Sequence, residues 1–506
     1  MSLLYKNTRN ANDSLSASKA IIQGLSAEGG LYVPEHIPAL DIPLSALKDM
    51  SYQEVAYTVM KQFLTDFTED ELHNCIDKAY DDKFDTQEIV PMKKIDDAYY
   101  LELFHGPTIA FKDMALSILP HLLTTAAKKH GITNEIVILA ATSGDTGKAA
   151  LAGFADVPGT KIIVFYPKDG VSKIQELQMV TQTGDNTSVV AIHGNFDDAQ
   201  SGVKAIFEDT VLQEKMNDLG YQFSSANSIN IGRLVPQIVY YVYAYGKLLR
   251  DGEIQDGEEI NVVVPTGNFG NILAAYYAKE MGLPIRKLIC ASNENKVLFD
   301  FFETGIYNRN REFILTASPS MDILISSNLE RLIYEIVGAN AQDNAQKMKD
   351  LKEVGYYDIT SEMKQKLDMF VGGYATEEQV AEEIKKTYEA THYVMDTHTA
   401  VAANVYRAYK AKTGDKTKTL IASTASPYKF AKHVLSALDT KYQGVDGAKL
   451  YQDVDELELI ESMQIVSGVE VPKAVKDILD AQILHTQECA ITDMKQMVED
   501  ILKFHS

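Results

Sequence analysis

The stretch LFHGPTIAFKDMALSIL, residues Leu103–Leu119, places a lysine just before an apolar run that resembles a helix. Lys112 follows Phe111, and the residues after Asp113 are almost all apolar. A lone lysine in such a place usually lays its methylene stem on apolar neighbours and keeps its ammonium in water. The alternative is an amine that is buried to do chemistry. The rest of the chain decides between the two.

Length and composition indicate a globular protein with more than one domain. The chain has 506 residues, of which 45% are hydrophobic and 24% charged. Its formal net charge is −23. The electric field of such a charge repels nucleic acids and anionic membrane surfaces. No apolar run approaches the roughly 20 residues that span a bilayer. We therefore expect neither a nucleic acid nor a membrane as a partner.

The cysteines indicate a reducing compartment. Cys75, Cys290 and Cys489 lie far apart and form no CxxC pair, so neither a disulfide framework nor a zinc site is expected. The N-terminal residues lack a basic flank followed by an apolar stretch, so no secretory signal is evident. We expect a cytoplasmic protein.

From about residue 97 onward, short strands rich in β-branched residues alternate with helices. Examples are EIVILAA (Glu135–Ala141), KIIVFYP (Lys161–Pro167) and INVVVP (Ile260–Pro265), each followed by a loop and a helical pattern. Repeated strand–loop–helix units predict the α/β class, with parallel sheets covered by helices on both faces. The loops then gather at the C-terminal ends of the strands, where ligands bind in such sheets.

The segment VVVPTGNFGN offers a possible phosphate site. Gly267 and Gly270 allow close backbone approaches, and the helix that begins near Gly270 points its free N–H groups into the loop. The alternative is a tight strand-to-helix turn in which glycine serves packing. The segment alone leaves both interpretations open.

Two further loops carry hydroxyl groups. In ATSGDTGKAA, Thr142, Ser143 and Thr146 suit a carboxylate or a phosphate. This loop is not a nucleotide-binding Walker A motif, because Thr142 stands where glycine is needed and Ala149 follows the lysine. In IASTASPYKF, Ser423 and Thr424 lie at the end of a strand, and each hydroxyl taken singly is better explained as a cap of the next helix than as a ligand contact.

Histidine and tyrosine point to no further site. His105, His193, His392 and His398 lack the spacing of metal ligands, so no metal is expected and each should make local hydrogen bonds. The tyrosine-rich segment QIVYYVYAYGKLL is expected to be core.

Together these features fit a phosphorylated aldehyde cofactor that is attached to a lysine. Burial disfavours the ammonium form, and only the neutral amine attacks a carbonyl. Asp113 should not oppose this, because neighbouring residues on a helix point to different faces. Lys112 is thus a candidate Schiff-base lysine for pyridoxal 5'-phosphate.

At these residues the sequence strongly resembles the threonine synthase family, which are fold-type II pyridoxal-phosphate enzymes. LFHGPTIAFKD, ATSGDTG, PTGNFGN and STASPYKF are similar to its motifs. The resemblance implies that Lys112 attaches the cofactor and that Thr424 meets the pyridine nitrogen. It implies phosphate binding by Gly267, Asn268, Phe269, Gly270 and Asn271, and substrate binding by Thr142, Ser143, Gly144, Asp145, Thr146 and Gly147.

The resemblance also implies a fold like that of the tryptophan synthase β subunit, with two open parallel-sheet α/β domains after a helical N-terminal region. We predict that residues 1–95 are mainly helical and that residues 131–221 form the smaller domain. The larger, cofactor-binding domain should comprise residues 96–130 and 222–470. A helical insertion is predicted at about 340–390, and a C-terminal cap at 471–506.

The implied reaction converts O-phospho-L-homoserine and water to L-threonine and phosphate, the last step of threonine biosynthesis. The enzyme would be a carbon-oxygen lyase, either a monomer or a homodimer. The rivals are a pyridoxal-phosphate-dependent phospholyase or serine/threonine dehydratase of the same fold. A cofactor-binding protein without turnover is less compatible with an intact Lys112 and three intact loops.

The substrate side is the least determined part of the resemblance. The chain departs from the family pattern at Lys148, Thr397, Ser426 and Tyr428. Lys148 and Lys173 are only candidates for holding the substrate phosphate. Asp145 would repel a substrate carboxylate, so we expect it to turn toward backbone or a substrate amine.

Overall fold

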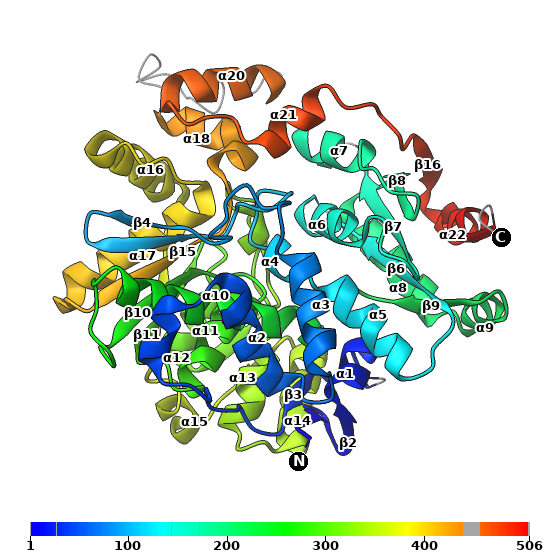
Figure 1. Ribbon diagram of the computed structural model, residues 1–506, viewed down its shortest axis with the longest axis horizontal. Helices are drawn as coiled ribbons and strands as arrows, with labels where there is room; N and C mark the ends of the chain where they lie inside the picture. Colours follow the sequence, from blue (N-terminus) through cyan, green and yellow to red (C-terminus); the bar gives the residue numbers. More distant parts are fainter. Residues whose placement is uncertain are drawn as a thin grey trace.

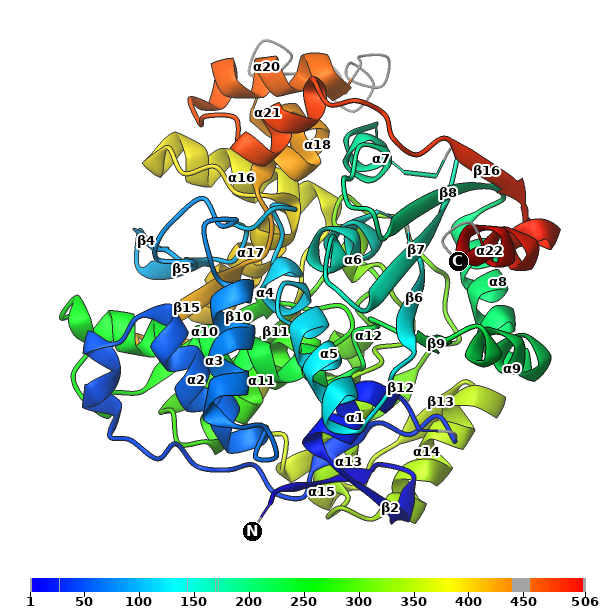
Figure 2. The same ribbon diagram turned by 45° about the vertical axis from the view of Figure 1, so that its right-hand side comes forward.

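Two β-sheets, each covered by helices, organise the chain (Figures 1 and 2). The computed structural model describes residues 2–26, 28–142, 144–168, 170–171, 173–438 and 456–503. Both sheets consist mainly of parallel strands. The predicted α/β class is confirmed.

The larger sheet has a buried parallel centre. Its strands lie in the order β14 (Phe370–Tyr374), β11 (Ile285–Ser292), β10 (Ile260–Pro265), β15 (Lys418–Ser423), β5 (Ala98–Glu102) and β4 (Met92–Ile95). Only β4 runs antiparallel to its neighbour. Val262 and Val264 pack on one face of β10 and Val263 packs on the other, the alternation that gives a strand two apolar faces.

Helices cover both faces of this sheet. The core on the first face includes α10 (Ile231–Arg250), α11 (Gly270–Glu280) and α12 (Val297–Thr304). The core on the second face includes α16 (Glu377–Thr391), α17 (Thr397–Thr413), α18 (Ala431–Leu438), α20 (Glu456–Ser467) and α21 (Lys473–Leu479). The apolar strands are therefore shielded from water on both sides.

The smaller sheet is parallel throughout. Its strands lie in the order β16 (Gln487–Ala490), β8 (Thr187–His193), β7 (Thr160–Pro167), β6 (Glu135–Ala141) and β9 (Tyr221–Ser224). The core on one face includes α6 (Asp145–Phe154) and α7 (Lys173–Val180). The core on the other includes α8 (Phe196–Glu208), α9 (Thr210–Asp218) and α22 (Met494–Lys503).

The remaining elements surround the larger sheet. The N-terminal region contains β1 (Leu4–Asn7), β2 (Asn10–Ser16), α1 (Ala17–Gln23), β3 (Tyr32–Pro34), α2 (Tyr52–Phe63) and α3 (Glu69–Ala79). The connection to the smaller sheet contains α4 (Asp113–Leu116) and α5 (Leu119–Lys129). After α12 come β12 (Ile306–Asn308), α13 (Leu329–Ile336), α14 (Ala341–Glu353), β13 (Tyr356–Asp358) and α15 (Ser361–Gln365).

The structure corrects three of the predicted segments. Residues 1–95 hold a three-stranded antiparallel sheet, β2-β1-β3, besides their helices. Residues 340–390 are not a helical insertion, because β14 lies within them and forms an edge of the larger sheet. Residues 471–506 do more than cap the fold, since β16 and α22 extend the smaller sheet and its helical layer. Apart from β2, these strands have only three to five residues, and the side-chain patterns of all of them are too weak to identify from sequence.

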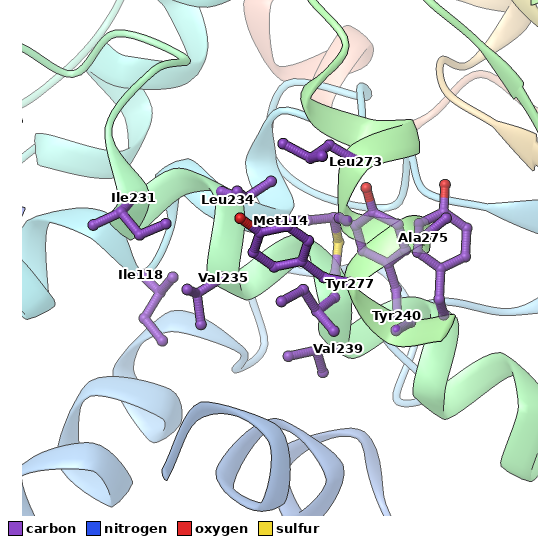
Figure 3. Packing of buried hydrophobic residues seen from close by; sticks show 14 of the residues in the cluster. Met114, Ile118, Ile231, Leu234, Val235, Val239, Tyr240, Leu273, Ala275 and Tyr277 are labelled. Atoms are coloured by element: carbon purple, nitrogen blue, oxygen red, sulfur yellow. The ribbon is translucent and has the colours of Figure 1, made fainter. Parts of the chain in front are cut away.

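The helix that begins after Lys112 is anchored in the largest core. Met114 of α4 and Ile118 pack with residues of α10 and α11, among them Leu234, Val235 and Tyr277 (Figure 3). Almost all of α10 is buried, which confirms that its tyrosine-rich segment is core. Burying each such aliphatic side chain stabilises the fold by about 1.5–3 kcal/mol. The backbone at Lys112 is therefore held on a rigid base.

Membrane-spanning helices are absent from the described part of the chain, where no helix is both long enough and apolar enough to cross a bilayer.

Candidate active site

Lys112 lies at the C-terminal edge of the larger sheet, next to the end of β15. The segment that precedes it runs beside residues 423–426 and is held by backbone hydrogen bonds. Leu103 N donates to Ser423 O over 2.9 Å and Phe111 N donates to Thr424 O over 2.8 Å. Two positions predicted as site residues, Lys112 and Thr424, are thus brought together although they are 312 positions apart in sequence.

The Lys112 amine sits in a setting that favours its neutral form. Its side chain is 14% exposed. Burial is the main cause that lowers the pKa of Lys112 to about 8; the charge of Asp145 opposes this shift, and the charges of Lys429 and Arg233 add to it. The Asp145 Oδ2 atom lies 3.7 Å from Lys112 Nζ. A nucleophilic amine is accordingly available near neutral pH.

Asp113 is turned away from Lys112, as predicted. Its carboxylate accepts hydrogen bonds from Thr108 N at 2.8 Å and from Thr108 Oγ1 at 2.6 Å. Asp113 is buried, and burial raises its pKa. It therefore braces the preceding loop and does not pair with the lysine beside it.

The loop of residues 267–271 joins β10 to α11 and is tightly packed. Phe269 adopts the left-handed conformation, with φ of 63°, and its ring packs against Phe302 and Phe370. A Cβ on Gly267 would lie 2.4 Å from Ser320 O, so only glycine fits there. The first N–H groups of α11 have no partners within the helix and face this loop.

Asn271 presents a donor suited to an anion. Its Oδ1 accepts hydrogen bonds from Tyr240 Oη at 2.7 Å and Tyr241 Oη at 2.5 Å. Both hydroxyls come from α10, so the core helix also fixes this side chain. The Nδ2 group is buried and has no hydrogen-bond partner in the described part of the chain. A buried amide donor without a partner costs free energy, and a phosphate oxygen would satisfy it.

The loop before α6 is organised by Thr142. Its Oγ1 accepts hydrogen bonds from Gly144 N at 2.9 Å and Gly147 N at 3.0 Å. Gly144 has φ of 135°, a conformation that favours glycine. The Thr142 hydroxyl thus braces the turn, a role that the sequence did not indicate. Ser143 lies outside the described residues, and Thr146 is half-buried in the first turn of α6.

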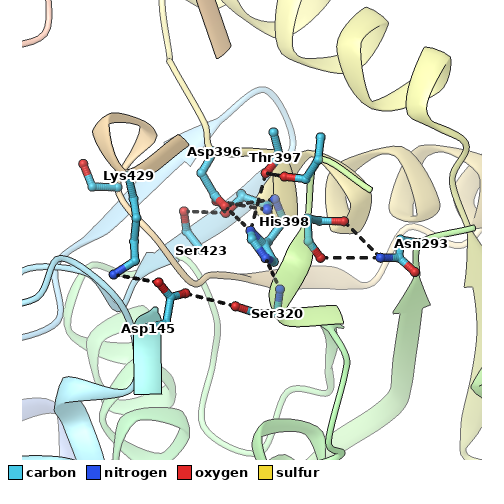
Figure 4. A network of polar contacts seen from close by, with 12 residues as sticks. Asp145, Asn293, Ser320, Asp396, Thr397, His398, Ser423 and Lys429 are labelled. Atoms are coloured by element: carbon cyan, nitrogen blue, oxygen red, sulfur yellow. Dashed lines mark hydrogen bonds and ion pairs between the residues drawn. The ribbon is translucent and has the colours of Figure 1, made fainter. Parts of the chain in front are cut away.

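Asp145 faces two lysines, contrary to the expectation that it turns toward backbone or a substrate amine. Lys429 Nζ lies 3.1 Å from its Oδ1 atom, and Ser320 Oγ donates to its Oδ2 atom over 3.1 Å (Figure 4). Gln175 Nε2 donates to Oδ1 over 3.0 Å. Burial alone would raise the pKa of Asp145, but Lys429 and Lys112 hold it well below its usual range.

A chain of hydrogen bonds through His398 and Asp396 holds the backbone of Ser320 in place. Ser320 N donates to His398 Nε2 over 3.2 Å, and His398 Nδ1 lies 2.8 Å from Asp396 Oδ2 (Figure 4). Thr399 Oγ1 contacts both Asp396 and Ser423, the latter at 3.1 Å. The expectation of local hydrogen bonding by His398 is confirmed. The network connects the end of β15 with the carboxylate of Asp145.

Three cationic side chains near the site differ in exposure. Lys148 is 4% exposed, its Nζ has no hydrogen-bond partner among the described residues, and burial lowers its pKa well below the usual value. Lys173 is instead a surface residue, paired with Glu176 at 3.0 Å. Arg233 of α10 is buried, and its Nε likewise has no partner in the described ranges.

Sequence reasoning missed Lys429, Ser320 and Arg233. Lys429 carried a usable signal, because it follows a strand end rich in hydroxyl groups and precedes Phe430 and Ala431, a setting like that of Lys112. Ser320 had no such signal, since it lies in a loop far from the recognised motifs.

Comparisons with known proteins agree with this geometry. Three family models match: "Threonine synthase N terminus" over residues 4–80, "Pyridoxal-phosphate dependent enzyme" over residues 93–425 and "Threonine synthase, C-terminal" over residues 399–479. The threonine synthase of Schizosaccharomyces pombe is 36% identical over 468 residues, which cover 86% of this chain and 89% of that protein.

Other relatives are longer. Threonine synthase-like 1 of Macaca fascicularis is 38% identical over 437 residues, but the match covers 84% of this chain and only 58% of that protein.

Solved structures are similar along the whole chain. The pyridoxal-phosphate-bound threonine synthase of Brucella melitensis has a TM-score of 0.86 at 32% identity and full coverage of both chains. Yeast threonine synthase has a TM-score of 0.85 at 32% identity and 99% coverage of both. The chain therefore belongs to the threonine synthase family of pyridoxal-phosphate-dependent enzymes.

Proposed function

We propose that the chain is a threonine synthase, converting O-phospho-L-homoserine and water to L-threonine and phosphate. The observation that carries this proposal is the position of Lys112. Its amine has a lowered pKa, and the backbone just before it is hydrogen-bonded to Thr424. The loop of residues 267–271 follows β10 of the same sheet. A lysine, a phosphate loop and a hydroxyl at one edge are what pyridoxal phosphate requires.

The proposed cofactor contacts follow from the groups present. Asn271 Nδ2 and the free N–H groups of the first turn of α11 would hold the phosphate, with Gly267, Asn268, Phe269 and Gly270 shaping the loop. Thr424 is buried and would meet the pyridine nitrogen as a neutral hydroxyl. When bound, the cofactor supplies an electron sink at the substrate's α-carbon.

Proton transfer is assigned to Lys112. With cofactor and substrate bound, the neutral Lys112 amine would take protons from the α- and β-carbons of the substrate and return them. Its low pKa suits this task, because a base works best when its pKa lies near the working pH. The other residues would hold the substrate so that phosphate leaves from the γ-carbon and water adds at the β-carbon.

Substrate binding is assigned to the start of α6 and to the buried cations. The turn of residues 142–147 would receive the carboxylate, with N–H groups and the hydroxyl of Thr146 as donors. Arg233 is the candidate for the substrate phosphate, since its buried Nε has no partner among the described residues. Lys148 is a second candidate, whereas Lys173 is already paired with Glu176 on the surface.

We also propose a cytoplasmic location and a monomeric or homodimeric state. Cys75, Cys290 and Cys489 are free and buried, which is compatible with a reducing compartment.

Product analysis tests the proposed reaction. The purified protein, loaded with pyridoxal phosphate, is incubated with O-phospho-L-homoserine. Threonine should form in step with phosphate. Phosphate together with a keto acid and ammonia, without threonine, would assign the enzyme to the phospholyases of the same fold. Turnover of serine or threonine in preference to the phosphorylated substrate would assign it to the dehydratases.

A further inference from the structure

Lys429 is a second lysine in the site, and its side chain is 1% exposed. Its Nζ donates to Thr108 O over 3.0 Å and lies 3.1 Å from Asp145 Oδ1. Thr108 belongs to the loop that leads into Lys112, whereas Asp145 begins α6 of the smaller sheet. The ammonium of Lys429 is thus fixed between the two parts of the site.

The Asp145 carboxylate divides its oxygens between the lysines. Oδ1 accepts from Lys429 and Gln175, while Oδ2 accepts from Ser320 and lies at the longer distance of 3.7 Å from Lys112. Lys429 is therefore the closer ionic partner. If it were absent, Lys112 would be the one remaining lysine within ion-pair distance of this carboxylate among the described residues.

We propose that Lys429 is a positioning residue. Its ammonium forms an ion pair with the Asp145 carboxylate, so that Lys112 can lose its proton while Asp145 stays ionised. A carboxylate 3.7 Å from a single lysine would stabilise the ammonium form. Lys429 weakens this effect in two ways. It pairs with the same carboxylate, and its positive charge repels the ammonium form of Lys112. The inference rests on the proposed role of Lys112 as the reactive amine.

The charged groups that face Lys112 support this account. These groups are Asp145 of α6, Lys429 in the segment after β15, and Arg233 of α10. Asp145 favours the protonated form of Lys112, and the two cations oppose it. Of the two cations only Lys429 also binds Asp145, so its removal takes away one repulsion and leaves Arg233 as the one cation that opposes the attraction of Asp145.

The test measures how fast Lys112 reacts as an amine at different pH values. The full-length chain without cofactor is treated briefly with acetic anhydride between pH 6 and 10, and acetylation of Lys112 is measured by mass spectrometry. In Lys429→Met the labelling of Lys112 should set in at a pH about one unit or more higher than in the wild type. Labelling at pH 7 is then about tenfold slower. Lys429→Arg keeps the charge and should stay near the wild type.

Lys247→Met is the matched control. Lys247 is also buried, at 8% exposure, and pairs with Glu88 at 2.7 Å. It lies near the C-terminal end of α10, whereas Arg233 of the site lies near the N-terminal end. Its replacement should not move the Lys112 profile. Coincident profiles for Lys429→Met, Lys247→Met and wild type would overturn the inference.

A second comparison applies if Lys429→Met does not fold, because that change leaves Asp145 buried with one ionic partner fewer. The double variant Asp145→Asn/Lys429→Met removes both charges and should label more slowly at pH 7 than Asp145→Asn alone, because the repulsion is gone. Equal rates would contradict the inference. Acetylation does not require pyridoxal phosphate, so this result is independent of the proposed function, which fails separately if the cofactor does not attach to Lys112.

Discussion

Asp145 and Lys429 face each other from different sheets, with Oδ1 of the carboxylate 3.1 Å from Nζ of the lysine. Asp145 is the first residue of α6, over the smaller sheet, and Lys429 follows β15 of the larger one. The pair thus joins the proposed substrate loop to the edge that carries Lys112 and Thr424. A buried ion pair contributes little net stability, but loss of one partner is strongly destabilising. Its position in the site places it where the chemistry depends on it as well.

Replacement of Lys112 tests the proposed base. Lys112→Ala should prevent covalent attachment of pyridoxal phosphate and lower turnover by about 10³-fold or more, since it removes both the attachment point and the proton carrier. The fold should persist, because the change removes a charge from a largely buried position. Absorbance of the bound cofactor, thermal unfolding and product formation are the measurements. Substantial remaining turnover would remove Lys112 from the mechanism.

The pKa of Lys112 predicts how cofactor attachment depends on pH. Burial lowers this pKa to about 8, so the amine is mostly protonated below pH 8 and mostly neutral above it. The rate of pyridoxal phosphate attachment to the cofactor-free chain should rise up to about pH 8 and then level off. Rapid mixing followed by absorbance measures this rate. A rate that continues to rise toward pH 10 would indicate an ordinary, exposed lysine.

Asn271 is predicted to bind the cofactor phosphate. Asn271→Ala removes the buried Nδ2 donor and should weaken binding by about 10–100-fold, the effect of one hydrogen bond to a charged group. Tyr241→Phe is the control, because it removes a hydroxyl that orients Asn271 while Tyr240 still donates to Oδ1. Its effect on cofactor affinity, measured by equilibrium dialysis, should be smaller. Equal effects would assign the loss to packing.

Gly267 and Gly270 provide a matched pair for the shape of the loop. Gly267→Ala places a Cβ 2.4 Å from Ser320 O and should destabilise the protein by about 1–3 kcal/mol, besides weakening cofactor binding. The Cβ of Gly270→Ala would have its nearest neighbour at 3.4 Å, an ordinary contact, and should cost much less. Denaturant unfolding of both variants makes the comparison. Similar losses would mean that the contact with Ser320 does not define the loop.

The sequence predicted the features that depend on local patterns. The β10–loop–α11 unit and the β6–loop–α6 unit were evident because apolar strands end in glycine-rich turns before helices. Lys112 stood out because a charged residue interrupts an apolar run. The α/β class followed from the repetition of these units.

Features that depend on distant partners could not be predicted. Lys429 acquires its role only when β15 lies beside the segment leading to Lys112. Ser320 reaches Asp145 because its loop packs against Gly267. The strands β14 and β16 pair with edges formed by residues far away in sequence. Their four or five residues carry no pattern that distinguishes them from loops.

Turnover in ¹⁸O-labelled water tests the proposed reaction most directly. If the carbon–oxygen bond at the γ-carbon breaks and water then adds at the β-carbon, one ¹⁸O atom enters the hydroxyl group of threonine and none enters the released phosphate. Mass spectrometry of both products from O-phospho-L-homoserine gives the answer. Labelled phosphate accompanied by homoserine would show cleavage of the phosphorus–oxygen bond and contradict the proposed function.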